Sequence, residues 1–150
     1  MEHFAGRQPW IVPFLRATEG LTAEQAASAP ARMNSPWSIV GHVALWHRIV
    51  LGRGGGLPAD DELARASGWD LAARGPEAEW TAARAHVRKL NADLAALVAV
   101  MPDADLGLKW APGRATRWQL LHGLVVHNAY HTGEVITTRQ AMRLWNEDRP

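Results

Sequence analysis

The stretch TRWQLLHGLVVHNAYHTGEVITTRQAM, residues 116–142, decides the fold of this chain. Its apolar residues recur every three or four positions, the spacing that brings side chains to one face of an α-helix. Thr116 is followed three residues later by Gln119, the pattern of a capping box at a helix N-terminus. We therefore predict a long helix that begins after Thr116, with an inward face made of Leu120, Leu124, His127, His131, Val135, Thr138 and Met142.

Helical spacing recurs near the start of the chain. A first helix is predicted over residues 8–18, and Pro13 inside this range is expected to bend it or delay its start, because proline cannot donate the hydrogen bond of a helix interior. Thr22 and Gln25 form a second capping-box pattern, which predicts a short extra turn.

The second long helix has a clear predicted start. Ser35 is a residue type that caps helix N-termini, and Pro36 suits the first helical position. Gly52 is expected to end this helix. Its predicted inner face carries Ile39, His42, Trp46, Ile49 and Val50.

A third helix is predicted over residues 76–101, and residues 103–115 are expected to be irregular. The connection over residues 53–75 is unusually long for a small domain and can cross the length of a bundle, and residues 60–66 within it are a candidate for a helical turn. Period-2 alternation typical of strands is absent from the sequence. We therefore predict an all-α fold, a four-helix bundle that forms a single domain over residues 1–150.

Composition excludes several classes of function. The 150 residues carry a formal net charge of +1 with scattered basic residues, so no nucleic-acid partner is expected. The sequence has no apolar stretch long enough to cross a membrane, and its N-terminus lacks the pattern of a secretion signal, which predicts a cytoplasmic protein. There is no cysteine, so any metal must be held by His, Asp or Glu, and thiol chemistry would need an external thiol.

The histidines are the candidate metal ligands. His127 and His131 lie four residues apart on the expected inward face, so their side chains should stack one helical turn apart. Two buried imidazoles need hydrogen-bond partners and repel each other when both are charged, and a shared divalent cation would remove both difficulties. His42 on the second helix is the natural third ligand. Its alternative role is that of a hydrogen-bonded core histidine, and spacing alone favours neither reading.

The remaining polar candidates are assigned other roles. His47 follows His42 by five positions, so the two side chains point about 140° apart around a helix. This angle predicts a position at the rim or surface for His47. The same argument puts His122 off the ligand face. Glu134 can approach the site from the next turn as a candidate catalytic group, or it can be solvated like most glutamates. His86 and the loop cluster Asp60, Asp61 and Glu62 are expected to be solvated. His3 lies in the N-terminal tail, and Asp70 is a candidate for a contact at the rim.

Two motifs resemble those of a known family. The segments SPWSIVGHVALW, residues 35–46, and LHGLVVHNAYHTGEV, residues 121–135, are similar to the second-helix and fourth-helix motifs of the DinB/YfiT-like superfamily of metal-binding bundles. The resemblance extends over essentially the whole chain in helix order. It implies up-down-down-up topology with a long crossover between helices two and three. It also implies that His42, His127 and His131 are the metal ligands, and it places His47 where related sequences often carry an acidic residue.

The resemblance also implies an activity. Characterised relatives bind nickel, zinc or similar ions, act mostly with bacillithiol, mycothiol or glutathione, and are frequently homodimers. Our first hypothesis is therefore a metal-dependent thiol S-transferase acting with a low-molecular-weight thiol such as bacillithiol. Trp46, Trp69 and Tyr130 are the candidate residues that would line the mouth of the metal site. The alternatives are a metal-dependent hydrolase with Glu134 as base, and a non-enzymatic, stress-related metal-binding protein.

Overall fold

The computed structural model describes residues 12–54, 69, 74–110 and 115–145. Over these residues the chain is helical, and the only β-type pairing in this part of the chain is an isolated bridge between Lys109 and Thr116. The predicted all-α class is confirmed. None of the helices in the described ranges is both long enough and apolar enough to cross a membrane.

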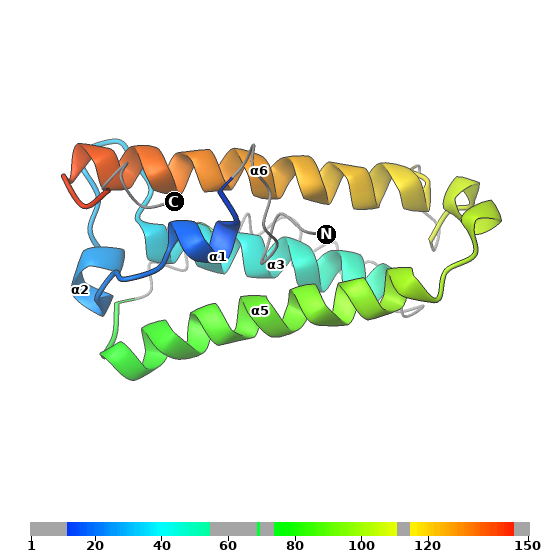
Figure 1. Cartoon of the computed structure of the whole chain (residues 1–150), viewed down its shortest axis with the longest axis horizontal. Coiled ribbons are helices and arrows are strands. Elements are labelled where there is room, and N and C mark those ends of the chain that lie inside the picture. Colours follow the sequence, from blue (N-terminus) through cyan, green and yellow to red (C-terminus); the bar gives the residue numbers. More distant parts are fainter. Residues whose placement is uncertain (1–11, 55–68, 70–73, 111–114, 146–150) are drawn as a thin grey trace.

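Three long helices lie side by side (Figure 1). They are α3 (Pro36–Gly54), α5 (Glu77–Ala99) and α6 (Arg117–Ala141). Helix α3 contacts both of the others, and α3 and α5 run in one direction while α6 returns (Figure 1). The parallel direction of α3 and α5 fits the predicted long crossover between them.

Two short helices complete the described part of the chain. Helix α1 (Phe14–Ala17) packs on α6, and α2 (Ala23–Ala26) packs on α5 and α3. Only one turn is described where a first long helix was predicted, so the four-helix count and the complete up-down-down-up order stay predictions.

The predicted helix starts rest on the expected caps. The hydroxyl of Ser35 accepts a hydrogen bond of 3.1 Å from the backbone N–H of Ser38. Thr22 and Thr116 each head a capping box with the glutamine three residues later. These side chains satisfy backbone donors that have no partner within the helix, which explains why α2, α3 and α6 begin where they do.

Several predicted boundaries need correction. Of the two effects predicted for Pro13 on the helix over residues 8–18, the delayed start is observed: Pro13 has extended backbone, with φ −60° and ψ 141°, and α1 begins only after it. Helix α3 runs two residues past Gly52. The stretch expected to be irregular contains a 3₁₀ helix, η1 (Asp103–Gly107). The turn predicted near residues 60–66 lies outside the described residues.

The core forms two clusters along the bundle. One gathers around the tilted pair Trp37 and Trp80, whose ring centroids are 5.4 Å apart, and the indole N–H of Trp80 donates to the carbonyl of Leu21 at 2.9 Å. The other cluster consists of Val50, Leu94, Trp110 and Leu124. The core therefore links α3 to both neighbours, and this packing fixes the distance between the two helices that carry the candidate ligands.

Two arginines hold the carbonyl end of α1. Arg139 on α6 is buried, and its guanidinium donates to the carbonyls of Ala17, Glu19 and Leu144. Arg84 on α5 donates to the carbonyl of Leu15 at 3.3 Å. The last carbonyls of a helix have no partners within it, so the two side chains satisfy groups that α1 leaves open and attach it to the long helices.

Candidate metal centre

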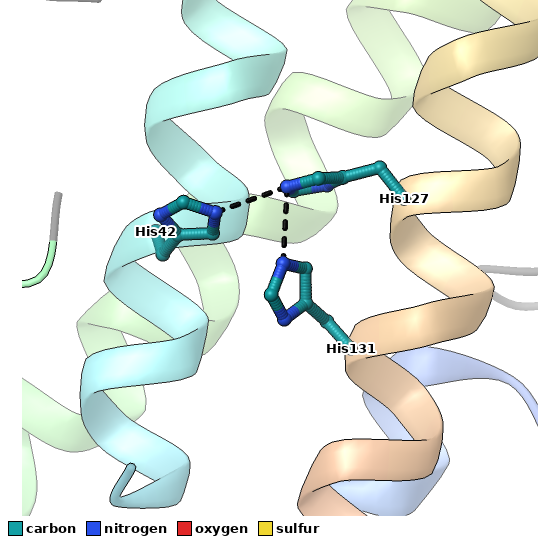
Figure 2. Close-up of side chains that lie close together, drawn as sticks. All are labelled: His42, His127 and His131. Atoms are coloured by element: carbon teal, nitrogen blue, oxygen red, sulfur yellow. Dashed lines mark hydrogen bonds between the residues drawn. The ribbon is translucent and has the colours of Figure 1, made fainter. Parts of the chain in front are cut away.

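The three candidate ligands converge between α3 and α6. The Nε2 atom of His127 lies 3.0 Å from Nε2 of His42 and 3.0 Å from Nε2 of His131 (Figure 2). One ring nitrogen from each of the three residues lies within 4.8 Å of the others. The predicted convergence of these three histidines is therefore present in the structure.

Local structure explains the convergence. His127 and His131 are one turn apart on the same side of α6, so their rings project together, and His42 projects toward them from α3 (Figure 2). His42 is 7% exposed and His131 is 3% exposed, whereas His127 is partly buried. The cluster is thus shielded from water but remains accessible from the His127 side.

Hydrogen bonding between the rings cannot satisfy all three. A ring nitrogen either donates one hydrogen or accepts through one lone pair, yet Nε2 of His127 has two equally close neighbours. Three nitrogens around a tetrahedral zinc ion at about 2.0–2.1 Å would be roughly 3.3 Å apart. The observed separations are close to this value, so the donor set and the spacing fit a divalent ion.

The electrostatics keep these rings neutral. Burial lowers the pKa of His127 to about 3, assisted by the neighbouring charges that His131 and His42 would carry. Burial also lowers the pKa of His131, although its contact with Glu134 acts in the opposite direction. A neutral imidazole is the form that binds a metal, so at neutral pH His127 and His131 can bind a cation without first losing protons.

Glu134 lies against the outer side of the His131 ring. Its Oε2 is 2.7 Å from Nδ1 of His131, and its Oε1 accepts a 2.7 Å hydrogen bond from the side-chain amide of Asn34. Both carboxylate oxygens therefore have partners. The carboxylate faces Nδ1, whereas the three converging atoms are Nε2 atoms, so Glu134 lies behind the ligand and not beside the open side of the cluster.

The three aromatic candidates all contact the histidine cluster. Trp69 stacks on His42 with a centroid distance of 4.1 Å and an interplanar angle of 12°. The Trp46 ring lies 5.8 Å from that of His127. Tyr130 meets His131 edge-on at 4.9 Å and is 70% exposed. These rings surround the cluster with apolar surface, which strengthens electrostatic interactions inside it.

The prediction of a rim or surface position for His47 is wrong. Its side chain is fully buried, Nδ1 donates to the carbonyl of Val43 at 2.8 Å, and Nε2 is 3.5 Å from the side-chain amide nitrogen of Asn128. Burial lowers the pKa of His47 to about 4. The helical angle was correct, but α3 is covered by α5 and α6 and has no wide solvent face.

The two other candidate histidines that the structure describes do not join the cluster. His122 is exposed and stacks on Trp118 with a centroid distance of 5.3 Å, and His86 is exposed on α5. The positions that lie outside the described residues are His3, Asp60, Asp61, Glu62 and Asp70.

Two asparagines near the cluster were missed by the sequence interpretation. Asn34 contacts Glu134, and Asn128 is buried beside His47. A signal existed for Asn128, because an amide between two inward histidines of one helix is a natural hydrogen-bond partner. Asn34 is 100 residues from Glu134 in the sequence and had no comparable signal.

Comparison with protein-family models matches residues 13–135 to the DinB superfamily. This range covers more than half of the chain and includes all three converging histidines. Comparisons with curated proteins and with solved structures found no match. The resemblance read from the two histidine-containing motifs is therefore confirmed at the level of the family.

Proposed function

The chain belongs to the DinB superfamily, and from this premise and the geometry of the cluster we propose that it binds one divalent metal ion through His42, His127 and His131. The observation that carries the proposal is the position of Nε2 of His127, 3.0 Å from Nε2 of each of the other two rings. Neutral imidazoles with converging lone pairs are a preferred ligand set for zinc, nickel and related ions.

Three protein ligands leave a coordination position open, which is typical of catalytic and not of structural zinc sites. An ion held by three neutral rings would keep its full +2 charge and would act as a Lewis acid toward a thiol or a polarised carbon–heteroatom bond. The chain's own residues would hold the ion, exclude water through Trp46 and Trp69, and keep the ligands in their neutral form.

We extend the proposal to S-transfer from a low-molecular-weight thiol such as bacillithiol. The sulfur would form a bond to an electrophilic carbon, the leaving group would depart with its bonding pair, and the thiol proton would pass to solvent. The family resemblance supports this chemistry, as do the open position and the absence of cysteine from the chain. Trp46, Trp69 and Tyr130 offer apolar surface for the electrophile.

The geometry gives less support to hydrolysis. A hydrolase needs a free general base close to the attacked bond, whereas both oxygens of Glu134 have partners and face away from the Nε2 atoms. A homodimer, a cytoplasmic location and a stress-related role stay predictions, as do zinc or nickel as the ion.

Elemental analysis of the tag-free protein tests the metal proposal. We expect about one zinc or nickel ion per chain after dialysis, and loss of the ion in His42→Ala, His127→Ala and His131→Ala. His86→Ala is the matched control, because His86 is exposed on α5 and should not affect binding. A wild-type protein without metal, or single variants that all keep the ion, would contradict the proposal.

The S-transfer extension has its own assay. Zinc-loaded and nickel-loaded protein would be mixed with bacillithiol, mycothiol or glutathione and a chlorinated fluorogenic electrophile such as monochlorobimane. We expect a rate above that of the apo protein and of His127→Ala with at least one thiol. Rates equal to the uncatalysed reaction for all three thiols would leave metal binding standing and refute thiol transfer to this class of electrophile.

A further inference from the structure

We propose that Glu134 and Asn34 are positioning residues that set the ring orientation and tautomer of His131 and hold α3 in register with α6 through contacts within the chain. This inference rests on the proposed metal function. It assigns to Glu134 a role different from that of a catalytic base, and it gives Asn34 a role in the site although it lies outside both long helices.

The first step is the tautomer of His131. An ionised carboxylate only accepts hydrogen bonds, so the 2.7 Å contact with Oε2 of Glu134 requires the hydrogen of the neutral ring to be on Nδ1. The lone pair is then on Nε2, which points toward His127 (Figure 2). Hydrogen bonds of this kind to the outer nitrogen of a ligand histidine orient the ring and raise its basicity.

The second step is the orientation of Glu134 itself. A free glutamate side chain samples many rotamers, and fixing it costs conformational entropy. Here Oε1 accepts a 2.7 Å hydrogen bond from the amide of Asn34, so the carboxylate is held at both oxygens. Glu134 is therefore held in position by contacts of the chain itself.

The third step links the two ligand-bearing helices. The carbonyl of Asn34 accepts a hydrogen bond from the hydroxyl of Thr138, which lies one turn after Glu134 on α6. Asn34 immediately precedes Ser35, the cap of α3, the helix that carries His42. Two adjacent turns of α6 thus contact Asn34, two residues before the start of α3, and these contacts fix the position of His42 along the bundle relative to His131.

The tautomer is tested first, in the apo protein and without reference to metal. Long-range ¹H–¹⁵N NMR spectra distinguish the two neutral forms of a histidine ring, and His131→Ala identifies the signals of His131. We expect the Nδ1–H form for His131 in the wild type and in Glu134→Gln, whose amide oxygen can still accept from the ring. Glu134→Ala should give a mixture of both tautomers. A wild-type ring in the Nε2–H form, or an unchanged ring in Glu134→Ala, would overturn the inference.

Zinc titration by calorimetry tests the consequence for binding. We expect Glu134→Ala to keep one site per chain with an affinity roughly 10–100-fold weaker, and Asn34→Ala to weaken binding by a smaller factor. Glu134→Gln should fall between Glu134→Ala and the wild type. Glu24→Gln is the charge-matched control, because Glu24 is exposed on α2, and it should bind like the wild type.

The outcomes separate this inference from the proposed function. If the wild type binds zinc and both Glu134→Ala and Asn34→Ala bind it with equal affinity, the positioning role is refuted while the metal site stands. If the wild type binds no metal, the proposed function fails together with the positioning role toward an ion. Thermal unfolding of the apo variants provides the structural comparison: a loss of zinc affinity that only tracks a loss of apo stability would overturn the inference.

Discussion

Acid should unfold this protein partly through His47. The ring is fully buried, and its pKa falls from 6.5 to about 4 on folding because burial disfavours the charged form. A histidine with a lowered pKa stabilises the fold above its unfolded pKa, and this contribution is lost as the pH falls from about 6.5 toward the folded pKa. For these two pKa values, His47 alone should reduce the free energy of unfolding by about 2 kcal/mol between pH 7 and pH 4.5.

Urea unfolding followed by circular dichroism, in the presence of a chelator, measures this effect. His47→Leu should be less stable at pH 7 by about 1–3 kcal/mol, because the amide of Asn128 loses its partner. Between pH 7 and pH 4.5, the free energy of unfolding of His47→Leu should fall by about 2 kcal/mol less than that of the wild type. His86→Leu, at an exposed position, is the control and should keep the wild-type pH dependence. If His47→Leu shows the full wild-type loss in acid, His47 is not the buried neutral group described here.

Two predictions concern the ends of helices. Arg139→Ala removes the donors to the carbonyls of Ala17 and Leu144, so it should lower the free energy of unfolding in urea by about 2–4 kcal/mol. Arg139→Lys should restore less than half of this loss, because an ammonium group lacks the planar fork of a guanidinium. Wild-type stability in Arg139→Ala would contradict this prediction. Arg143 follows α6 with φ 59°, a left-handed conformation that costs a side chain about 1 kcal/mol, so Arg143→Gly should raise stability by about 0.5–1 kcal/mol. Arg88→Gly, at an exposed position inside α5, should lower the free energy of unfolding by about 1 kcal/mol. If Arg143→Gly and Arg88→Gly change the stability in the same direction, the argument is refuted.

The helical period of the sequence was sufficient to predict that His127 and His131 lie together, whereas the inclusion of His42 needed the family resemblance. His127 and His131 share a face with Leu124 and Val135, both of which are buried, and the helical period alone places the two rings together. The caps at Thr22, Ser35 and Thr116 were equally readable, because a capping side chain and its partner are only three residues apart. Features with local causes were thus predicted correctly.

The error at His47 has a specific physical reason. A helical wheel gives the angle between two side chains but not how much of the helix circumference is covered by neighbours. Helix α3 carries only the charged residues Arg48 and Arg53 among its 19 residues, and eleven of its residues are buried. A helix with so few charges is expected to be enclosed by neighbours, so this composition was the signal that His47 would be buried.

The contacts of Asn34 and Trp69 could not be derived from local pattern. Asn34 reaches a carboxylate 100 residues away, and Trp69 reaches His42 from the connection between α3 and α5. Such contacts depend on how loops lie over the packed helices, and the helical period of the sequence does not predict this arrangement. These residues lie around the histidine cluster, so the sequence predicted the convergence of the histidines better than their surroundings.

X-ray absorption spectroscopy of the zinc-loaded protein tests the central claim most directly, because it counts the ligands of the ion. We predict three imidazole nitrogens at about 2.0–2.1 Å and one further light atom. A zinc ion surrounded mainly by oxygen, or an imidazole count other than three, would contradict the three-histidine site.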